Sequence, residues 1–349
     1  MGPHIDHTLQ GRPAARNPNP GALVRELLRP EAYPGPAPSG VEVRHTHASW
    51  VFLTDGEAWK VKRPVSRGAF DFSDADRRRR GCEEEVRLGR RLAPDVYRGV
   101  APVHHGPEGH AFVGTGAVVD FAVRMRKLPE EESAGVLLAL GRLTPRHLQR
   151  LAERLAAFYQ ASPALRNGPT LGRADIVENY HRALPYAGRL LDAALLERVY
   201  RGQRELVAQH EAELLDRASR GRIREGHGDL RLEHVYFPGG GAEDPAVIDP
   251  LEFDDRLRQA DVALDVAFLV MELEAHHRPD LTAAFLSRFA SATGDFEFYP
   301  LLDISASHRA ATRARVACQV ATARDTSPAK ASRKAAEANR LLALAASYM

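Results

Sequence analysis

The period of the hydrophobic pattern changes near residue 128, and this change constrains the fold more than any other feature of the sequence. Between residues 38 and 127 the apolar residues alternate in short runs that predict β-strands, with one helix among them. From residue 128 onward they follow a helical period. We therefore expect an α+β protein with two lobes, a small five-stranded antiparallel lobe at 38–127 and a larger, mainly helical lobe at 128–349. Residues 1–37, rich in Pro and Gly, are expected to be a disordered or partly helical tail.

A hairpin is predicted in the strand-rich lobe. Asp55–Gly56 is a strong two-residue turn signal between two alternating runs. Counting outward from this turn places Lys62 opposite Ser49 and keeps Lys60 and Lys62 on one face of their strand. Lys62 then lies nearer to the loop at 47–49, where backbone N–H groups could cradle phosphates.

The predicted helix of this lobe runs from about Ser73 to Leu92. Glu85, Leu88 and Leu92 follow one another at positions i, i+3 and i+7, so Glu85 borders the apolar stripe. A carboxylate at that border could reach a strand lysine. Glu83 points elsewhere, and we expect it to be solvated.

The larger lobe has the signals of several helices. Thr144–Pro145 predicts an N-cap followed by Pro at the first helical position. The longest apolar run, Val262–Leu273, is interrupted by Asp265 and is too short to span a bilayer. Further helices are expected over about 175–192, 194–219, 257–275, 279–291, 297–323 and 328–347.

Two aspartates mark the candidate site. Asp229 belongs to the stretch His227–His234, and Asp249 follows a short apolar strand that could pair with the first stretch in a hairpin whose tip is Pro238–Gly241. One carboxylate could accept the proton of a substrate hydroxyl while the other holds the Mg²⁺ that bridges nucleotide phosphates. The alternative is that both are ordinary turn aspartates, since Asp is common where loops begin.

Composition argues against several classes of partner. The net charge is only +2, and the run Arg77–Arg80 is followed at once by Glu83–Glu85, which suits a charged helix face better than a nucleic-acid site. Cys82 and Cys318 are far apart, so neither a disulfide framework nor a zinc site is indicated. The first residues lack the apolar core of a signal peptide. We expect a cytoplasmic protein without nucleic-acid or membrane partners.

In these motifs and their order the sequence resembles the aminoglycoside phosphotransferase family, the small-molecule branch of the protein-kinase-like fold, from about Val41 to the C-terminus. Within the family it looks most like a small-molecule kinase-like group. The resemblance is carried by the runs His45–Val51, Lys60–Pro64, Cys82–Leu88 and His227–Leu269. It implies ATP-dependent transfer of the γ-phosphate to a hydroxyl of a small molecule, with nucleotide bound in 38–127 and the catalytic loop in 128–349.

The resemblance also implies residue roles. Lys62 would grip the α- and β-phosphates, and Glu85 would hold Lys62. Asp229 would be the catalytic base, Arg231 would neutralise the transferring phosphoryl group, and Asp249 would bind Mg²⁺. Asp265 would brace the catalytic loop. Nucleotide-binding residues are expected at Ser49, Lys60, Lys62, Glu85, Lys127 and Leu128.

His234 departs from the family pattern, which has Asn at this position as an oxygen ligand for a metal. Imidazole is a poorer Mg²⁺ ligand than a carboxamide oxygen. Three outcomes are open: a single Mg²⁺ on Asp249, a softer ion such as Mn²⁺ shared with His234, or weakened transfer. We favour the first. The third would make the chain a nucleotide-binding pseudokinase or regulatory module.

The acceptor is not fixed by these motifs. Acidic residues between Asp249 and Asp261 would suit a polycationic aminoglycoside, but such residues recur in the family whatever the substrate. The Arg-rich segment His308–Arg315 either lines the acceptor side of the cleft or is a solvated helix face, and we favour the solvated face. The expected partners are therefore a nucleotide and a small hydroxylated acceptor.

Overall fold

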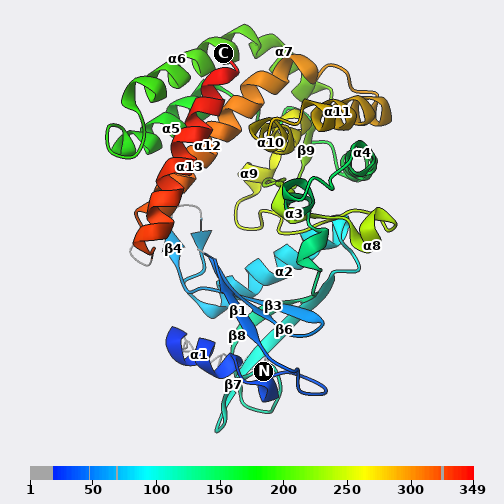
Figure 1. Ribbon diagram of the computed structural model, residues 1–349, viewed down its shortest axis with the longest axis vertical. Helices are drawn as coiled ribbons and strands as arrows, with labels where there is room; N and C mark the ends of the chain where they lie inside the picture. The colour runs from blue at the N-terminus through cyan, green and yellow to red at the C-terminus, as the bar shows by residue number, and fades with distance from the viewer. Residues whose placement is uncertain (1–18, 47, 68–69, 324–325) are drawn as a thin grey trace, which may run out of the picture. The chain divides into compact units, whose positions relative to one another are not determined.

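The computed structural model of the protein describes residues 19–46, 48–67, 70–323 and 326–349 (Figure 1). It divides into two compact units. The first comprises the described residues up to Glu83 together with Gly99–Lys127, and the second comprises Glu84–Arg98 together with Leu128–Met349. His47, part of the expected phosphate loop, lies outside the described residues.

A six-stranded sheet of order β1-β2-β3-β8-β6-β7 forms the first unit. Its strands are β1 (Glu42–His45), β2 (Ser49–Leu53), β3 (Glu57–Lys62), β6 (Tyr97–Gly106), β7 (Gly109–Ala111) and β8 (Ala117–Arg126), and a separate pair consists of β4 (Ser66–Arg67) and β5 (Phe70–Asp71). The main sheet has one strand more than the five expected, because β1 forms a separate strand that pairs antiparallel with β2. Thr46 supports this reversal, since its Oγ1 accepts the N–H of Ser49 at 2.8 Å.

The hairpin predicted at Asp55–Gly56 is confirmed. β2 and β3 pair antiparallel, with Ser49 opposite Lys62 and Val51 opposite Lys60. This is the register counted outward from the two-residue turn. Lys62 therefore lies at the end of the hairpin beside Ser49, as predicted.

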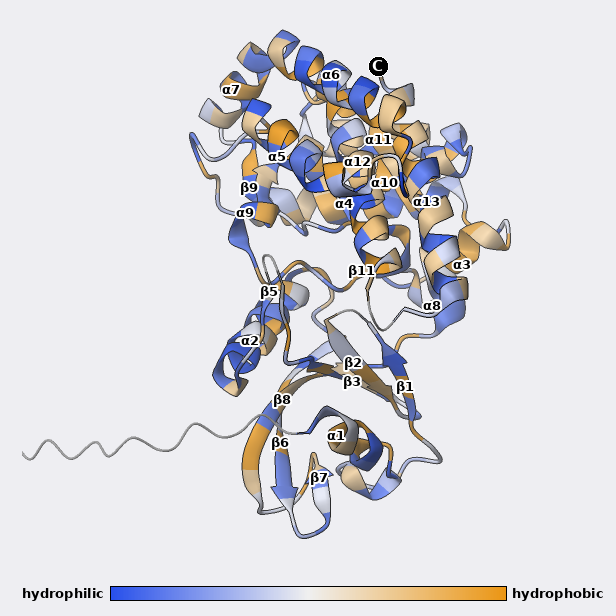
Figure 2. Cartoon of the chain, turned by 90° about the vertical axis from the view of Figure 1, so that its left-hand side faces the viewer, coloured by the Kyte–Doolittle hydropathy of each residue, from blue (hydrophilic) through white to orange (hydrophobic). Residues whose placement is uncertain are grey.

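The segment that precedes the sheet is part of the core rather than a tail. Residues 1–18 lie outside the described residues, but α1 (Pro20–Leu27) is an amphipathic helix whose Leu23 and Leu27 are fully buried with Trp59. Figure 2 shows α1 beside β6 and β7. The sequence predicted the helical part of this segment, but it did not predict that burial of two leucines fixes the helix to the sheet.

α2 (Ala75–Leu92) forms where the charged helix was predicted. Nε of Arg78 donates to both carboxylate oxygens of Asp120 on β8, at 2.8 and 3.0 Å, and both side chains are buried. A Cβ at Gly81 would lie 3.1 Å from Cε of Lys62, so the glycine leaves the space through which the lysine side chain runs along the helix. A larger residue at this position would displace the lysine.

The second unit is mainly helical (Figure 1). Its helices are α3 (Ala134–Ala139), α4 (Pro145–Ala161), α5 (Arg173–Ala183), α6 (Ala193–Gln209), α7 (Glu211–Ser219), α8 (Pro238–Gly241), α9 (Asp255–Arg258), α10 (Val262–Ala275), α11 (Pro279–Thr293), α12 (Leu302–Ala321) and α13 (Pro328–Ser347). The single helix expected over 194–219 is divided into α6 and α7, because the backbone leaves the helical conformation at His210. The predicted hairpin is confirmed by the pairing of β10 (Val235–Tyr236) with β11 (Ala246–Val247).

α10 is buried among the helices of the second unit, with α12 on one side and α11 on the other (Figure 1). Most of its side chains are buried, including the polar Asp265. Across the described residues, no helix combines the length and the apolar character that crossing a membrane requires. Preceding α10, β12 (Gln259–Asp261) pairs with β9 (Ile223–Glu225), which leads into the candidate catalytic loop.

A buried ion-pair cluster fixes the start of α10. Arg217 donates to both carboxylate oxygens of Asp261, each at 2.8 Å, and to both oxygens of Asp295, at 2.8 and 3.0 Å. Asp261 also caps α10 by accepting the N–H of Ala263 at 2.8 Å. Although burial opposes its charge, the two carboxylates raise the pKa of Arg217. The cluster therefore holds the helix that supplies Asp265.

Substitution Arg217→Met is expected to destabilise the protein by about 3 to 5 kcal/mol, because it leaves two buried carboxylates without their cation. Urea unfolding followed by circular dichroism measures the difference in unfolding free energy between the variant and the native chain. Arg220→Met is the matched control, since Arg220 pairs with Glu297 at the exposed end of the same helix region and is expected to change stability by less than about 1 kcal/mol. Equal losses in the two variants would contradict the role of the cluster.

Candidate active site

The loop between β9 and β10 is shaped by two glycines. A Cβ at Gly226 would lie 2.4 Å from Oδ2 of Asp265, and Gly228 has a φ of +81° with Leu251 packed 2.9 Å from the position of a Cβ. Neither position has room for a side chain, and the second also needs a left-handed backbone. The glycines thus let the backbone of this loop approach the start of α10.

Asp265 holds the loop through its carboxylate. Oδ2 accepts the N–H of His227 at 2.6 Å and Oδ1 accepts the N–H of Gly228 at 2.9 Å. The hydroxyl of Tyr159 donates to Oδ2 at 2.7 Å. Three donors on one buried carboxylate fix the backbone immediately before Asp229. The bracing position expected for Asp265 is confirmed by these contacts.

His227 connects the loop to the strand that precedes Asp249. The backbone N–H of Asp229 donates to Nδ1 of His227 at 3.3 Å, so Nδ1 is an acceptor. Nε2 therefore carries the proton that it donates to the carbonyl of Ile248 at 2.9 Å. Burial lowers the pKa of His227, which keeps the ring neutral. No role was predicted for this ring, although its position directly before Gly228 and Asp229 was a signal in the sequence.

Asp229 and Asp249 lie on two sides of His234. Nδ1 of His234 donates to the carbonyl of Asp229 at 2.8 Å and lies 3.7 Å from its Oδ2. Nε2 lies 3.6 Å from Oδ2 of Asp249. The side chains of Asp229 and Asp249 are 26% and 45% exposed, so both carboxylates can reach a ligand. The structure thus brings together Asp229, Asp249 and His234, the candidate base, the candidate metal ligand and the residue that departs from the family pattern.

Asp249 has an unusual backbone conformation. Its φ is +62°, which few residues other than Gly, Asn and Asp adopt. The backbone N–H donates to the hydroxyl of Tyr97 at 2.8 Å, and the preceding N–H, that of Ile248, donates to the carbonyl of His234 at 2.9 Å. These contacts on both sides of the turn direct the carboxylate toward the imidazole of His234.

The donor set fits a divalent cation. Asp249 offers a carboxylate on a side chain that is 45% exposed, and a carboxylate is the kind of ligand that Mg²⁺ prefers. Because Nδ1 of His234 donates to a carbonyl, Nε2 is the ring nitrogen that faces Asp249 and could offer a lone pair to an ion. A nitrogen and an oxygen 3.6 Å apart can bind one ion of the Mn²⁺ type.

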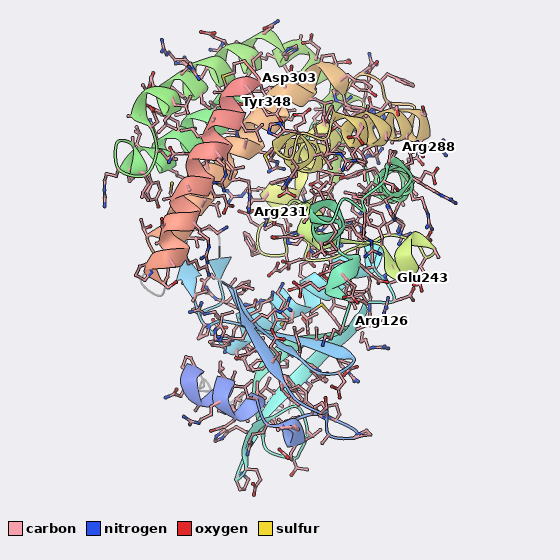
Figure 3. All side chains as sticks on the ribbon, in the orientation of Figure 1. Arg126, Arg231, Glu243, Arg288, Asp303 and Tyr348 are labelled. Carbon is pink, nitrogen blue, oxygen red and sulfur yellow. The ribbon has the colours of Figure 1, made fainter. Side chains whose placement is uncertain are left out.

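Arg231 is held by acidic residues. Nε of Arg231, which Figure 3 labels, donates to Oε1 of Glu272 on α10 at 3.1 Å. Nη1 pairs with Glu233. The other oxygen of Glu272 accepts the N–H of Leu232 at 2.7 Å. Burial alone would lower the pKa of Arg231, but the charges of Asp229, Glu272 and Glu233 raise it. Glu272 was not predicted, although it follows Asp265 by seven residues and so lies on the same face of α10.

Two arginines of α12 belong to the same charge cluster. The charge of Asp229 acts on both Arg309 and Arg313, and that of Arg231 acts on Arg313. Arg309 is buried, with Nε donating to the carbonyl of Leu264 at 3.0 Å and its guanidinium 4.2 Å from the ring centre of Phe268. The solvated face that we favoured for this helix is therefore wrong. An Arg-rich composition does not reveal which side chains tertiary packing covers.

The predicted nucleotide-binding residues of the first unit differ in exposure. Ser49 and Lys62 are buried, Lys60 is half-buried and Lys127 is exposed. Nζ of Lys127 donates to the carbonyl of Thr54 at 3.1 Å, so this lysine supports the hairpin. A buried lysine such as Lys62 needs a compensating charge or ligand.

Two further predicted residues belong to the second unit. Glu85 lies on α2 and is buried, and Leu128 is half-buried at the start of the second segment of the unit. Burying a carboxylate lowers the stability of the fold unless the carboxylate has a specific partner. This burial distinguishes Glu85 from the exposed Glu83, as the helical phase predicted.

Comparison with known proteins gives sequence relatives and structural neighbours. No protein-family model matches the chain. The chain is 32% identical over 293 residues to uncharacterised proteins of Mycobacterium tuberculosis and Mycobacterium bovis. The matched region takes 82% of this chain but 57% of theirs, so the chain spans little more than half the length of these relatives.

Among solved structures, the chain is similar to a Ralstonia eutropha protein provisionally assigned as an aminoglycoside phosphotransferase, with a TM-score of 0.52 and 12% identity. The match covers 93% of this chain and 95% of that protein. A choline/ethanolamine kinase family protein of Mesorhizobium loti has a TM-score of 0.48 and 14% identity, over 90% of this chain and 94% of that one. At such identities the likeness to the Ralstonia protein is one of fold.

Substitution Asp265→Asn is expected to loosen the loop before Asp229, because an amide cannot accept hydrogen bonds from three donors through the same two atoms. The expected loss is about 1 to 3 kcal/mol in unfolding free energy, with faster amide hydrogen exchange at His227 and Gly228. Tyr159→Phe removes only the hydroxyl donor and is expected to leave exchange at the two amides nearly unchanged. Unchanged exchange in the Asp265 variant would contradict the brace.

Proposed function

The chain has the protein-kinase-like fold of the aminoglycoside phosphotransferases, as its sequence predicted, and we propose that it transfers the γ-phosphate of ATP to a hydroxyl of a small molecule. The observation that supports this most is the placement of Asp229 and Asp249 on two sides of His234, on a loop that Asp265 fixes. Two partly exposed carboxylates held by buried contacts are what positioned proton transfer and cation binding need.

In the proposed reaction the acceptor oxygen attacks the γ-phosphorus of ATP. A bond between that oxygen and phosphorus forms, the bond from phosphorus to the β,γ-bridging oxygen breaks, and ADP leaves. Asp229 accepts the proton of the hydroxyl. Its backbone is fixed by His227, so the carboxylate meets the acceptor in one orientation and little entropy is lost on reaching the reactive geometry.

Asp249 and His234 would hold the divalent cation in this proposal. When bound, such a cation neutralises charge on the nucleotide phosphates. Arg231 is placed to stabilise the phosphoryl group as it is transferred, and its carboxylate partners Glu272 and Glu233 keep the guanidinium ionised and oriented.

The nucleotide contacts remain predictions. We propose that Lys62 binds the α- and β-phosphates, that Glu85 orients Lys62 and that Ser49 caps the phosphates. Burial of Lys62 and Glu85 and the position of Lys62 at the hairpin end support this proposal. Lys60, Lys127 and Leu128 are proposed as secondary nucleotide contacts, although the hydrogen bond of Lys127 to Thr54 also gives it a structural role.

A second candidate function is nucleotide binding without efficient transfer. His234 favours it, because a nitrogen ligand stands where the family has a carboxamide oxygen. The exposed and oriented carboxylates of Asp229 and Asp249 favour transfer instead. We therefore keep phosphotransfer as the principal proposal.

Substitution Asp229→Asn is expected to lower turnover by about 10² to 10⁴, because the amide cannot accept the hydroxyl proton. Transfer is measured by ³¹P NMR with ATP and a panel of hydroxylated acceptors, and ATP binding is expected to stay within about twofold. Asp244→Asn, which changes an exposed aspartate between β10 and β11, is the control. Turnover in the Asp229 variant equal to that of the control would reject Asp229 as the base.

Substitution His234→Asn tests whether the imidazole binds the cation. If Nε2 is a ligand, the native chain binds ATP more tightly with Mn²⁺ than with Mg²⁺. The variant is then expected to lower the ratio of the ATP affinity with Mn²⁺ to that with Mg²⁺ about tenfold or more. Calorimetric titration of ATP with each ion measures the ratio. A ratio that the substitution leaves unchanged would instead support one cation held by Asp249 without His234.

A further inference from the structure

α12 presents two arginines on one side of the helix near the proposed base. Arg309 and Arg313 are four residues apart and therefore lie one turn apart on the same face. The charge of Asp229 acts on both. Nε of Arg309 also donates to the carbonyl of Leu264 at 3.0 Å, directly before Asp265, which braces the loop that carries Asp229.

These arginines differ in how fully they are paired. Arg231 is hydrogen bonded to Glu272 and paired with Glu233. Arg313, in contrast, makes no hydrogen bond with any part of the chain that the structure describes, and its ion pair with Glu337 of α13 is long, at 3.9 Å. Its side chain is 16% exposed, so a ligand can reach it. Arg313 is thus a cation with unused donors beside the base.

Arg309 adds a second sign of an incomplete site. Its Nη2 is buried and has no hydrogen-bond partner among the described residues. A charged donor without a partner in the protein interior is costly. Burial lowers the pKa of both Arg309 and Arg313, and the neighbouring Arg231 lowers that of Arg313 further. An anion at this face would stabilise both charges.

The acidic residues that would attract a cationic acceptor are already paired. Asp254 pairs with Arg256 at 2.8 Å, and Asp255 pairs with Arg258 at 2.6 Å. Asp261, also in the segment that could have suited an aminoglycoside, is buried against Arg217. These three carboxylates have cationic partners within the fold, whereas Arg309 and Arg313 on α12 keep donors that no described residue uses.

We propose that the acceptor carries a carboxylate or phosphate group, which Arg313 binds while the acceptor hydroxyl faces Asp229. Arg309 supports this anion site from the more buried turn of α12. The inference rests on the proposed phosphotransferase function and narrows it to anionic hydroxylated substrates such as hydroxy acids and sugar phosphates. Guanidinium groups bind both carboxylates and phosphates through paired N–H donors.

The experiment compares anionic, neutral and cationic acceptors of similar size. Phosphotransfer and calorimetric binding are measured for glycerate, glycerol 3-phosphate, glycerol and ethanolamine, with a nonhydrolysable ATP analogue and Mn²⁺ present for binding. The first two compounds separate a carboxylate from a phosphate source of the charge. We expect at least one of them to bind more tightly than glycerol and ethanolamine by about tenfold or more.

Three variants assign the preference to Arg313. Arg313→Gln is expected to raise the KM and Kd of the anionic compound about tenfold to a hundredfold while kcat changes less. Arg313→Lys is expected to restore part of the affinity, and Arg313→Glu to reverse the preference toward ethanolamine. The control is Arg288→Gln, which removes an exposed arginine of α11 paired with Glu153 (Figure 3).

Failure of the inference is distinguishable from failure of the proposed function. Tighter binding of ethanolamine than of either anion, or an Arg313→Gln variant with unchanged affinity for anions, would overturn the anion site even if transfer occurs. An equal fall in kcat for every acceptor would place Arg313 on the transferred phosphoryl group and would also overturn it. Arg313-dependent anion binding without phosphotransfer would keep the anion site and reject the enzymatic proposal.

Discussion

The carboxylate of Asp265 is the contact on which the candidate site depends. It lies in the first turn of a buried helix and accepts two consecutive backbone N–H groups of the loop before Asp229. A loop with two glycines would otherwise sample many conformations, because glycine restricts the backbone least. One buried acceptor with three donors removes that freedom. The helix is fixed in turn by the Arg217 cluster, so the position of the proposed base follows from buried ion pairs some distance away in the sequence.

Two histidine rings connect the parts of the candidate site. His227 is a neutral cross-link that joins the loop to the strand before Asp249, and burial keeps it neutral. His234 occupies the space between the two aspartates, with one nitrogen used by a backbone carbonyl and the other near the Asp249 carboxylate. This arrangement supports cation binding with a nitrogen donor, and it explains how the chain can retain both carboxylates while lacking the oxygen ligand of the family pattern.

The distribution of arginine pairs bears on the substrate. Asp254 and Asp255 are paired with arginines of their own segment, whereas Arg313 on α12 makes no hydrogen bond with the described residues and its ion pair with Glu337 is long. Electrostatic selection of a ligand depends on the charges that remain after internal pairing, and not on the number of charged residues in the sequence. That distinction is the reason for proposing an anionic acceptor.

The sequence by itself determined the local elements and the order of the site residues. Asp55–Gly56 fixed the register of Lys62, and the helical phase separated the buried Glu85 from the exposed Glu83, because both depend on short-range geometry. The sequence did not determine that residues 20–27 join the core, or that Arg309 in the Arg-rich segment of α12 is buried. Only the tertiary structure decided these points, because burial and charge pairing depend on residues that are distant in the chain and meet only when it is folded.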